Sequence, residues 1–214
     1  MFTRSSSFLI TVGLLSSSCF SSHRALVETS ALPPPPDPVV RHSRRLWVEL
    51  EPGVGSSQCV EPQRSRPLCF DEVDRALAEA LSRALWTSFP GVYELGFSDR
   101  PEPGDYLLKV DLRLDAVPPN AGGPGWAAVA KGRWQLIRDG RVLAGESVES
   151  RSRADFAYGR PLGTGAGEVV DAVALHVGVV LGSVPESAPD RPVLLPPVSA
   201  QPFAPAAPRL VAGR

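Results

Sequence analysis

A strictly alternating stretch over residues 106–117 constrains the fold of this chain more than any other feature. Every second residue from Tyr106 to Leu114 is apolar. The other face carries the charged residues Lys109, Asp111, Arg113 and Asp115. Successive side chains of a β-strand point to opposite faces, so the stretch predicts a strand with one buried side and one solvent-facing side. Pro118 ends this strand because proline has no backbone N–H to donate.

A β-hairpin is predicted next. Residues 126–137 and 141–151 flank Asp139-Gly140, which suits a two-residue type I′ turn because both turn positions need a positive φ. The turn also sets the register of the two strands. The expected cross-strand pairs are Leu136 with Leu143, Trp134 with Gly145, and Arg133 with Glu146.

The clearest helix is predicted over residues 71–89. Its apolar positions recur at helical spacing: Val73, Leu77, Leu81, Leu85 and Phe89. Asp71 is the expected N-cap, and Pro90-Gly91 is expected to stop the helix.

A second helix is predicted over residues 168–184, although its many valines make a strand the alternative. Its length and its three-to-four spacing favour the helix, and Pro185 closes it. The glycine-rich residues 163–167 before it lack the Lys-Ser/Thr of a phosphate-binding loop, so a flexible helix entry is expected there.

The fold class predicted from these elements is α+β. With a first short strand at residues 46–50, the expected order is β-α-β-β-β-α. Two helices with apolar stripes would cover one face of a mostly antiparallel sheet, forming a two-layer sandwich in a single domain over residues 46–184.

The first 19 residues are typical of an export signal, with one arginine, an apolar run and three serines before Cys19. The apolar run is shorter than the roughly 20 residues that a membrane-spanning helix needs. The stretch from Leu15 to Cys19 resembles a lipobox, which implies that Cys19 carries acyl chains such as palmitate and begins the mature protein. Ser16 stands where a lipobox normally has leucine, so an ordinary signal cut near Ser18 and a transmembrane anchor are the alternatives. Phe20 in place of aspartate favours the outer membrane.

Proline-rich segments flank the predicted domain. Residues 20–45 contain four consecutive prolines and are expected to be an extended tether. Residues 185–214 are rich in proline and alanine and are expected to be a disordered tail, either passive or partner-binding.

A disulfide between Cys59 and Cys69 is predicted because an exported chain folds in an oxidising compartment. Once Cys19 is set aside for lipid, these two are the remaining cysteines. A metal site is the alternative, but the spacing matches no common zinc motif and no histidine is near.

No catalytic residue, cofactor or metal site is predicted. His23 and His42 fall in the expected tether, and His176 has no partner at a spacing that suggests a catalytic triad. The net charge of −1 argues against a nucleic-acid partner. Candidate ligand or partner contacts are Trp126, Arg113 and Arg133, the arginines on the solvent-facing side of the sheet.

The region from residue 105 to residue 184 resembles the C-terminal half of the auxiliary lipoproteins of ABC-type lipid transport systems, the PqiC-like family. The stretches that carry the resemblance are residues 106–112, 132–136 and 139–144, followed by the closing apolar helix. The resemblance implies a strand-hairpin-helix unit behind a lipobox and no enzymatic activity. The Cys59–Cys69 loop and the shortened N-terminal strands depart from the family.

The predicted function is therefore a non-enzymatic envelope lipoprotein. It would be attached to a membrane on the periplasmic side and serve as an adaptor for a protein partner in a transport or assembly complex. The solvent-facing side of the sheet or the tail would make the contact. A carrier for lipid or another apolar ligand between helices and sheet is the main alternative, and a periplasmic hydrolase is the third.

Overall fold

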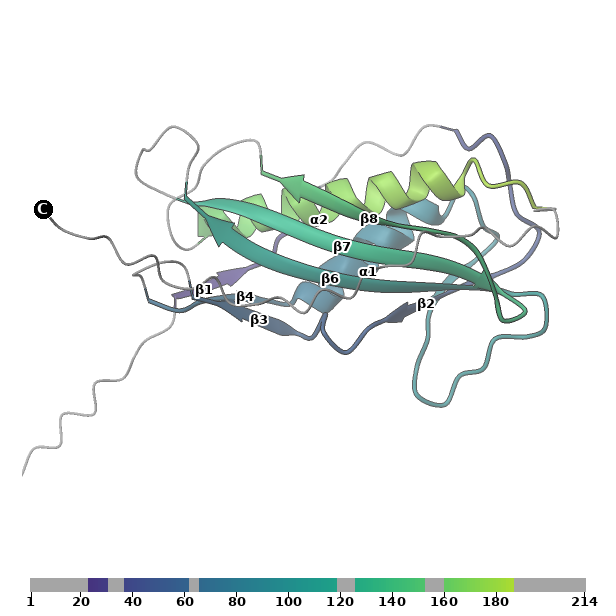
Figure 1. Cartoon of the computed structure of the whole chain (residues 1–214), viewed down its shortest axis with the longest axis horizontal. Coiled ribbons are helices and arrows are strands. Elements are labelled where there is room, and N and C mark those ends of the chain that lie inside the picture. The colour runs from purple at the N-terminus through teal and green to yellow at the C-terminus, as the bar shows by residue number, and fades with distance from the viewer. Residues whose placement is uncertain (1–22, 31–36, 62–65, 119–125, 153–159, 187–214) are drawn as a thin grey trace, which may run out of the picture.

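The computed structural model describes residues 23–30, 37–61, 66–118, 126–152 and 160–186 (Figure 1). The predicted signal segment, Cys19, and the tail beyond residue 186 lie outside these ranges. The strands are β1 (His23–Leu26), β2 (Leu46–Leu50), β3 (Ser57–Val60), β4 (Leu68–Asp71), β5 (Val92–Glu94), β6 (Tyr106–Val117), β7 (Ala127–Arg138) and β8 (Arg141–Arg151). The helices are α1 (Val73–Leu85) and α2 (Arg160–Leu181).

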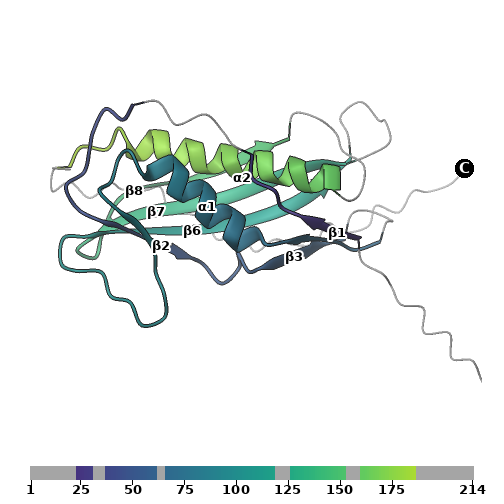
Figure 2. The ribbon, with the colours of Figure 1, turned by 180° about the vertical axis from the view of Figure 1, so that it is seen from behind.

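The predicted α+β sandwich is confirmed. A five-stranded sheet has the order β5-β2-β6-β7-β8, and both helices lie over one of its faces (Figure 2). The long pairings β6–β7 and β7–β8 are antiparallel, whereas β2 runs parallel to both β5 and β6. The predicted element order was incomplete, because β5 adds an edge strand to this sheet. In addition, β1, β3 and β4 form a second sheet of three strands in the order β1-β4-β3.

The predicted hairpin is present, but its register is wrong by one residue over most of its length. Asp139 and Gly140 have φ of 49° and 76°, as a type I′ turn requires. A β-bulge beyond the turn leaves Leu143 without a paired residue. The pairs are therefore Leu136 with Ala144, Trp134 with Glu146, and Arg133 with Ser147.

The start of α1 also differs from the prediction. Asp71 is the last residue of β4 and not the N-cap, because its backbone pairs with β1 and β3. Its carboxylate accepts hydrogen bonds from Ser57 at 2.8 Å and from Arg24 at 3.3 Å. Glu72 is the N-cap, with a left-handed φ of 61° and no side-chain cap bond.

The prediction of a tether over residues 20–45 is wrong for its described part. Strand β1 pairs in parallel with β4, and Ala25 is buried, as is His42 further on. The proline run of that segment lies outside the described residues.

Helix α2 begins eight residues earlier than predicted, so Gly163 and Gly167 are helical and not a flexible entry. A Cβ on Gly163 would lie 2.0 Å from the carbonyl oxygen of Leu26, and one on Gly167 would lie 1.8 Å from that of Glu28. Glycine is therefore the residue that lets the chain of β1 and its continuation lie directly on the helix.

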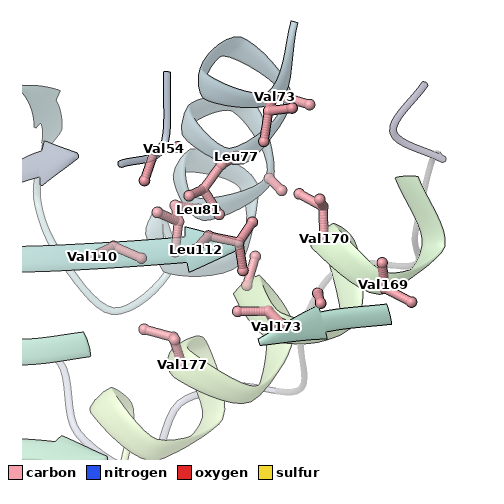
Figure 3. Packing of buried hydrophobic residues seen from close by; sticks show 14 of the residues in the cluster. Val54, Val73, Leu77, Leu81, Val110, Leu112, Val169, Val170, Val173 and Val177 are labelled. Atoms are coloured by element: carbon pink, nitrogen blue, oxygen red, sulfur yellow. The ribbon is translucent and has the colours of Figure 1, made fainter. Parts of the chain in front are cut away.

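The core lies between the two helices and the large sheet (Figure 3). Its centre consists of side chains that are at most 1 % exposed: Leu77, Leu81, Val110, Leu112, Val170, Val173 and Val177. Within the described residues, α2 is the helix whose length and hydropathy would suffice to cross a membrane, and 61 % of that apolar window is buried in the fold. Its apolar character is therefore explained by its place in the core.

The side chain of Gln58 extends the large sheet where β2 ends. Its Nε2 donates to the carbonyl of Leu112 at 2.8 Å, and its Oε1 accepts from the backbone N–H of Leu114 at 2.8 Å. The amide thus takes the place of a peptide unit of a neighbouring strand at the part of the β6 edge that β2 does not pair with. It thereby joins the two sheets.

Replacing Gln58 with alanine is expected to lower the free energy of unfolding by about 2 kcal/mol, because two backbone groups of β6 lose their partner. Urea denaturation of the purified domain measures this. Gln58→Glu is a matched variant that keeps an acceptor for Leu114 but sets an oxygen against the Leu112 carbonyl, so it is also expected to be destabilised. Wild-type stability in both variants would contradict this role.

Candidate functional site

The outer face of the large sheet, opposite the helices, carries the residues predicted to make contacts. Asp111 of β6 faces Arg133 of β7, and Arg113 faces Lys131. An open groove of about 920 Å³ lies over this part of the sheet, and Val60 and Glu61 also line it. The alternation of β6 predicted the face on which Asp111 and Arg113 lie, and pairing with β7 places Arg133 and Lys131 on the same face.

Arg113 and Arg133 are exposed, and neither forms an ion pair with a described residue. Arg113 stands directly opposite another cation, Lys131, an arrangement that costs stability between neighbouring strands. Trp126 does not join them. It is half-buried at the start of β7 and packs against the core.

A second feature of the outer face is an apolar row that crosses the whole sheet. Pairing in register places one apolar side chain from each strand side by side. From β5 to β8, the residues of this apolar row are Tyr93, Trp47, Leu107, Ile137 and Val142. Tyr93 is 47 % exposed and Val142 is 37 % exposed, and the three between them are half-buried.

The loop between β5 and β6 presents Phe97, whose side chain is fully exposed. Asp99 holds the turn below it: the Gly96 N–H donates to Asp99 Oδ2 at 2.9 Å, and the Asp99 N–H donates to the Gly96 carbonyl at 3.1 Å. Buried Asp105 holds the end of the loop by accepting from the Trp47 indole N–H at 2.9 Å. The loop is thereby connected to the apolar row.

A buried polar cluster around His42 lies near the end of α2. His42 Nε2 is 3.2 Å from the carbonyl oxygen of Leu181, and Nδ1 is 3.3 Å from the Tyr106 hydroxyl. A carbonyl only accepts, so Nε2 carries the proton and Nδ1 accepts from Tyr106. Arg138 donates to the Tyr106 oxygen at 3.0 Å, and the imidazole stacks on Phe89.

This cluster connects the segment before β2 to β6 and to the end of α2, so its role is structural. Burial, followed by the nearby Arg138, lowers the pKa of His42, while the Leu181 carbonyl and Glu186 oppose this shift. Burial also raises the pKa of Tyr106. The sequence gives no signal for this cluster, because His42 stands in a polar segment with no periodic pattern.

Acidification is expected to lower the free energy of unfolding by protonating His42. The folded pKa of His42 lies below its usual value of 6.5, so its contribution to stability is complete above pH 6.5 and is lost as pH falls through the lower folded pKa. Urea unfolding at pH 7.5 and pH 5.0 should therefore show a smaller pH dependence for His42→Gln, whose amide does not titrate. An equal pH dependence in wild type and variant would contradict this expectation.

His176 has a partner that its sequence position did not suggest. Its Nε2 contacts the carboxylate of Glu146 on β8, and both side chains are exposed to solvent. Among the described residues, no group of three or more His, Cys, Asp or Glu side chains is placed to hold a metal ion. Cys59 and Cys69 instead face each other across β3 and β4 and form the predicted disulfide.

A groove of about 330 Å³ lies between the C-terminal ends of the two helices and residues 37–39. Its lining is mainly apolar, with Ala84, Val179 and Val180 among its residues. The Thr87 hydroxyl oxygen in this lining is buried and has no hydrogen-bond partner among the described residues.

No protein-family model matches the chain, and no curated protein matches it. Among solved structures, a Xanthomonas campestris protein of the DUF330 family model has a TM-score of 0.46 and 16 % identity, covering 68 % of this chain and 94 % of that one. A minor lipoprotein from Acinetobacter baumannii has a TM-score of 0.38 and 11 % identity, covering 66 % and 92 %. A hypothetical protein from Chlamydia trachomatis has a TM-score of 0.34 and 14 % identity, covering 64 % and 96 %. At these TM-scores the likeness to the three structures is coarse.

Proposed function

We propose that this chain is a non-enzymatic lipoprotein of the cell envelope that acts as an adaptor for a protein partner. The observation that carries the proposal is the outer face of the large sheet. The helices cover the other face, while this one presents an ordered surface of apolar and charged rows. Exposed apolar groups in register and rimmed by polar residues are typical of protein contact sites.

The lipid anchor is proposed from the lipobox resemblance at Cys19. Strand β1 begins only four residues later, at His23, so the chain between them spans at most about 14 Å. The anchor would therefore hold the β1 end of the domain close to a membrane, and the outer membrane is proposed. The Cys59–Cys69 disulfide supports folding in an oxidising compartment such as the periplasm.

Replacing Cys19 with serine tests the anchor. The Cys19→Ser chain should move from the membrane fraction to the soluble fraction and lose labelling by an alkyne analogue of palmitate. A chain with both Cys59 and Cys69 changed to serine is the matched control and should keep its label. Labelling that persists without Cys19 would overturn the anchor.

The carrier alternative is favoured by the apolar groove between the helix ends, whose volume is at the lower limit of small-molecule sites. Native mass spectrometry after gentle detergent extraction distinguishes the two functions. A protein bound at fixed stoichiometry supports the adaptor. Lipid bound without any protein would replace it with the carrier.

A further inference from the structure

We propose that the apolar row and Phe97 together form a docking site for an amphipathic helix of a partner protein. The inference rests on the proposed adaptor function and specifies which part of the outer face makes the contact. The proposed contact surface differs from the one predicted from the sequence, because Arg113 and Arg133 lie further along the same strands.

The position of the apolar row makes it unlike scattered surface apolar residues. Single exposed apolar side chains are common and need no explanation. Here all five strands contribute one at the same level, whereas the next level along the sheet is polar, with Glu49 paired to Lys109 at 3.0 Å. Both helices lie on the opposite face, so no described element buries this row.

The dimensions of the apolar row fit a helix. Neighbouring strands are about 4.8 Å apart, so a row across five strands is ~19 Å long. A helix of about 13 residues has this length, and its apolar stripe recurs every three to four residues along one side. An extended peptide laid across the strands would gain no backbone pairing, since pairing requires a strand edge.

Phe97 has the properties of an anchor residue. Its turn is held by Asp99, and Asp105 connects the end of the loop to Trp47 of the apolar row. The backbone that presents Phe97 is thus ordered before any partner binds, which reduces the entropy lost on association. Buried aromatic anchors supply much of the binding free energy at protein interfaces.

Charge and position favour a protein partner over a membrane surface. Residues 93–105 contain four acidic residues and one arginine, a net charge of −3, and Arg45 pairs with Glu102 of this loop at 4.0 Å, which leaves a net charge of −2. That charge suits basic residues or the positive N-terminal end of a helix and repels anionic lipid. The loop before β6 also lies at the far end of the domain from β1, where the proposed anchor attaches (Figures 1 and 2).

Photo-crosslinking of the full chain in its native host tests the proposal. The photoreactive residue p-benzoylphenylalanine replaces Phe97, Val142 or, as control, Ser82, which is exposed on α1. The first two positions should capture the same protein, within a peptide of helical apolar periodicity, and the control should not. Capture of phospholipid alone, capture of a second copy of this chain, or equal capture at Ser82 would each overturn the proposal.

Binding by the isolated pair gives the second measurement. Phe97→Ala should weaken binding of the captured protein at least tenfold, and Phe97→Leu should restore part of it, with the melting temperature unchanged because Phe97 is fully exposed. A complex that survives Phe97→Ala and Val142→Glu unchanged would refute this site while leaving the adaptor function intact. Absence of any protein partner in native mass spectra would refute the adaptor function itself.

Discussion

Replacing Gly167 with alanine is expected to lower the free energy of unfolding by about 3 kcal/mol, although the same change normally stabilises a helix by about 1 kcal/mol. The added Cβ would lie 1.8 Å from the carbonyl oxygen of Glu28. This oxygen belongs to the backbone, so it can move away only if the segment after β1 separates from α2. Urea denaturation measures the loss. Gly163→Ala should behave similarly, because its Cβ would lie 2.0 Å from the Leu26 carbonyl.

The matched control for this prediction is Ala172, which is exposed on the same helix. Ala172→Gly should cost about 1 kcal/mol through helix propensity alone. A gain in stability for Gly167→Ala would mean that β1 does not lie against α2.

Replacing Asp171 with alanine is also expected to cost about 3 kcal/mol. This carboxylate is only 2 % exposed and joins three parts of the chain. Its Oδ2 accepts from the Ser30 backbone N–H at 2.8 Å and the Ser30 hydroxyl at 2.9 Å, and its Oδ1 accepts from Arg83 of α1 at 3.0 Å. Removal leaves the Ser30 N–H without a partner.

Asp171→Asn retains an acceptor for Ser30 and should lose less than half as much stability in the same urea titration. Arg75→Ala, which breaks ion pairs on the exposed side of α1, should show no measurable change. Equal stability of Asp171→Ala and wild type would contradict the role of this carboxylate.

The sequence predicted those elements whose pattern is local. Strand β6 was found with its full bounds because alternation over 12 residues depends only on neighbours in the chain. The hairpin was found from Asp139-Gly140 for the same reason. Its register was wrong because a β-bulge adds the unpaired residue Leu143 to β8, and the two-residue turn does not specify this bulge.

Elements that depend on distant partners were not predicted. Strand β1 has four residues and no periodicity. It forms because its backbone pairs with β4 and packs against α2. Gly163 and Gly167 lower helix propensity, so the start of α2 was placed after them. Tertiary contact with the N-terminal segment outweighs that local preference.

The alternation of residues 106–117 placed Arg113 on the outer face of the sheet, and the predicted hairpin placed Arg133 there. The apolar row becomes visible only when the register of five strands is known. One signal was present in the sequence: Leu107 is apolar, whereas the next four positions of the same face, from Lys109 to Asp115, are charged. His42 gave no such signal.

The contacts of the N-terminal segment determine when the fold can be completed during synthesis or export. Ser30 and its partner Asp171 are 141 residues apart, and β1 rests on glycines of the same final helix. A chain that emerges N-terminus first, from a ribosome or a translocation channel, therefore cannot bury its first strand until its last helix has emerged. Until then the leading segment stays accessible to proteases and chaperones, and full protease resistance should arise only once α2 is released.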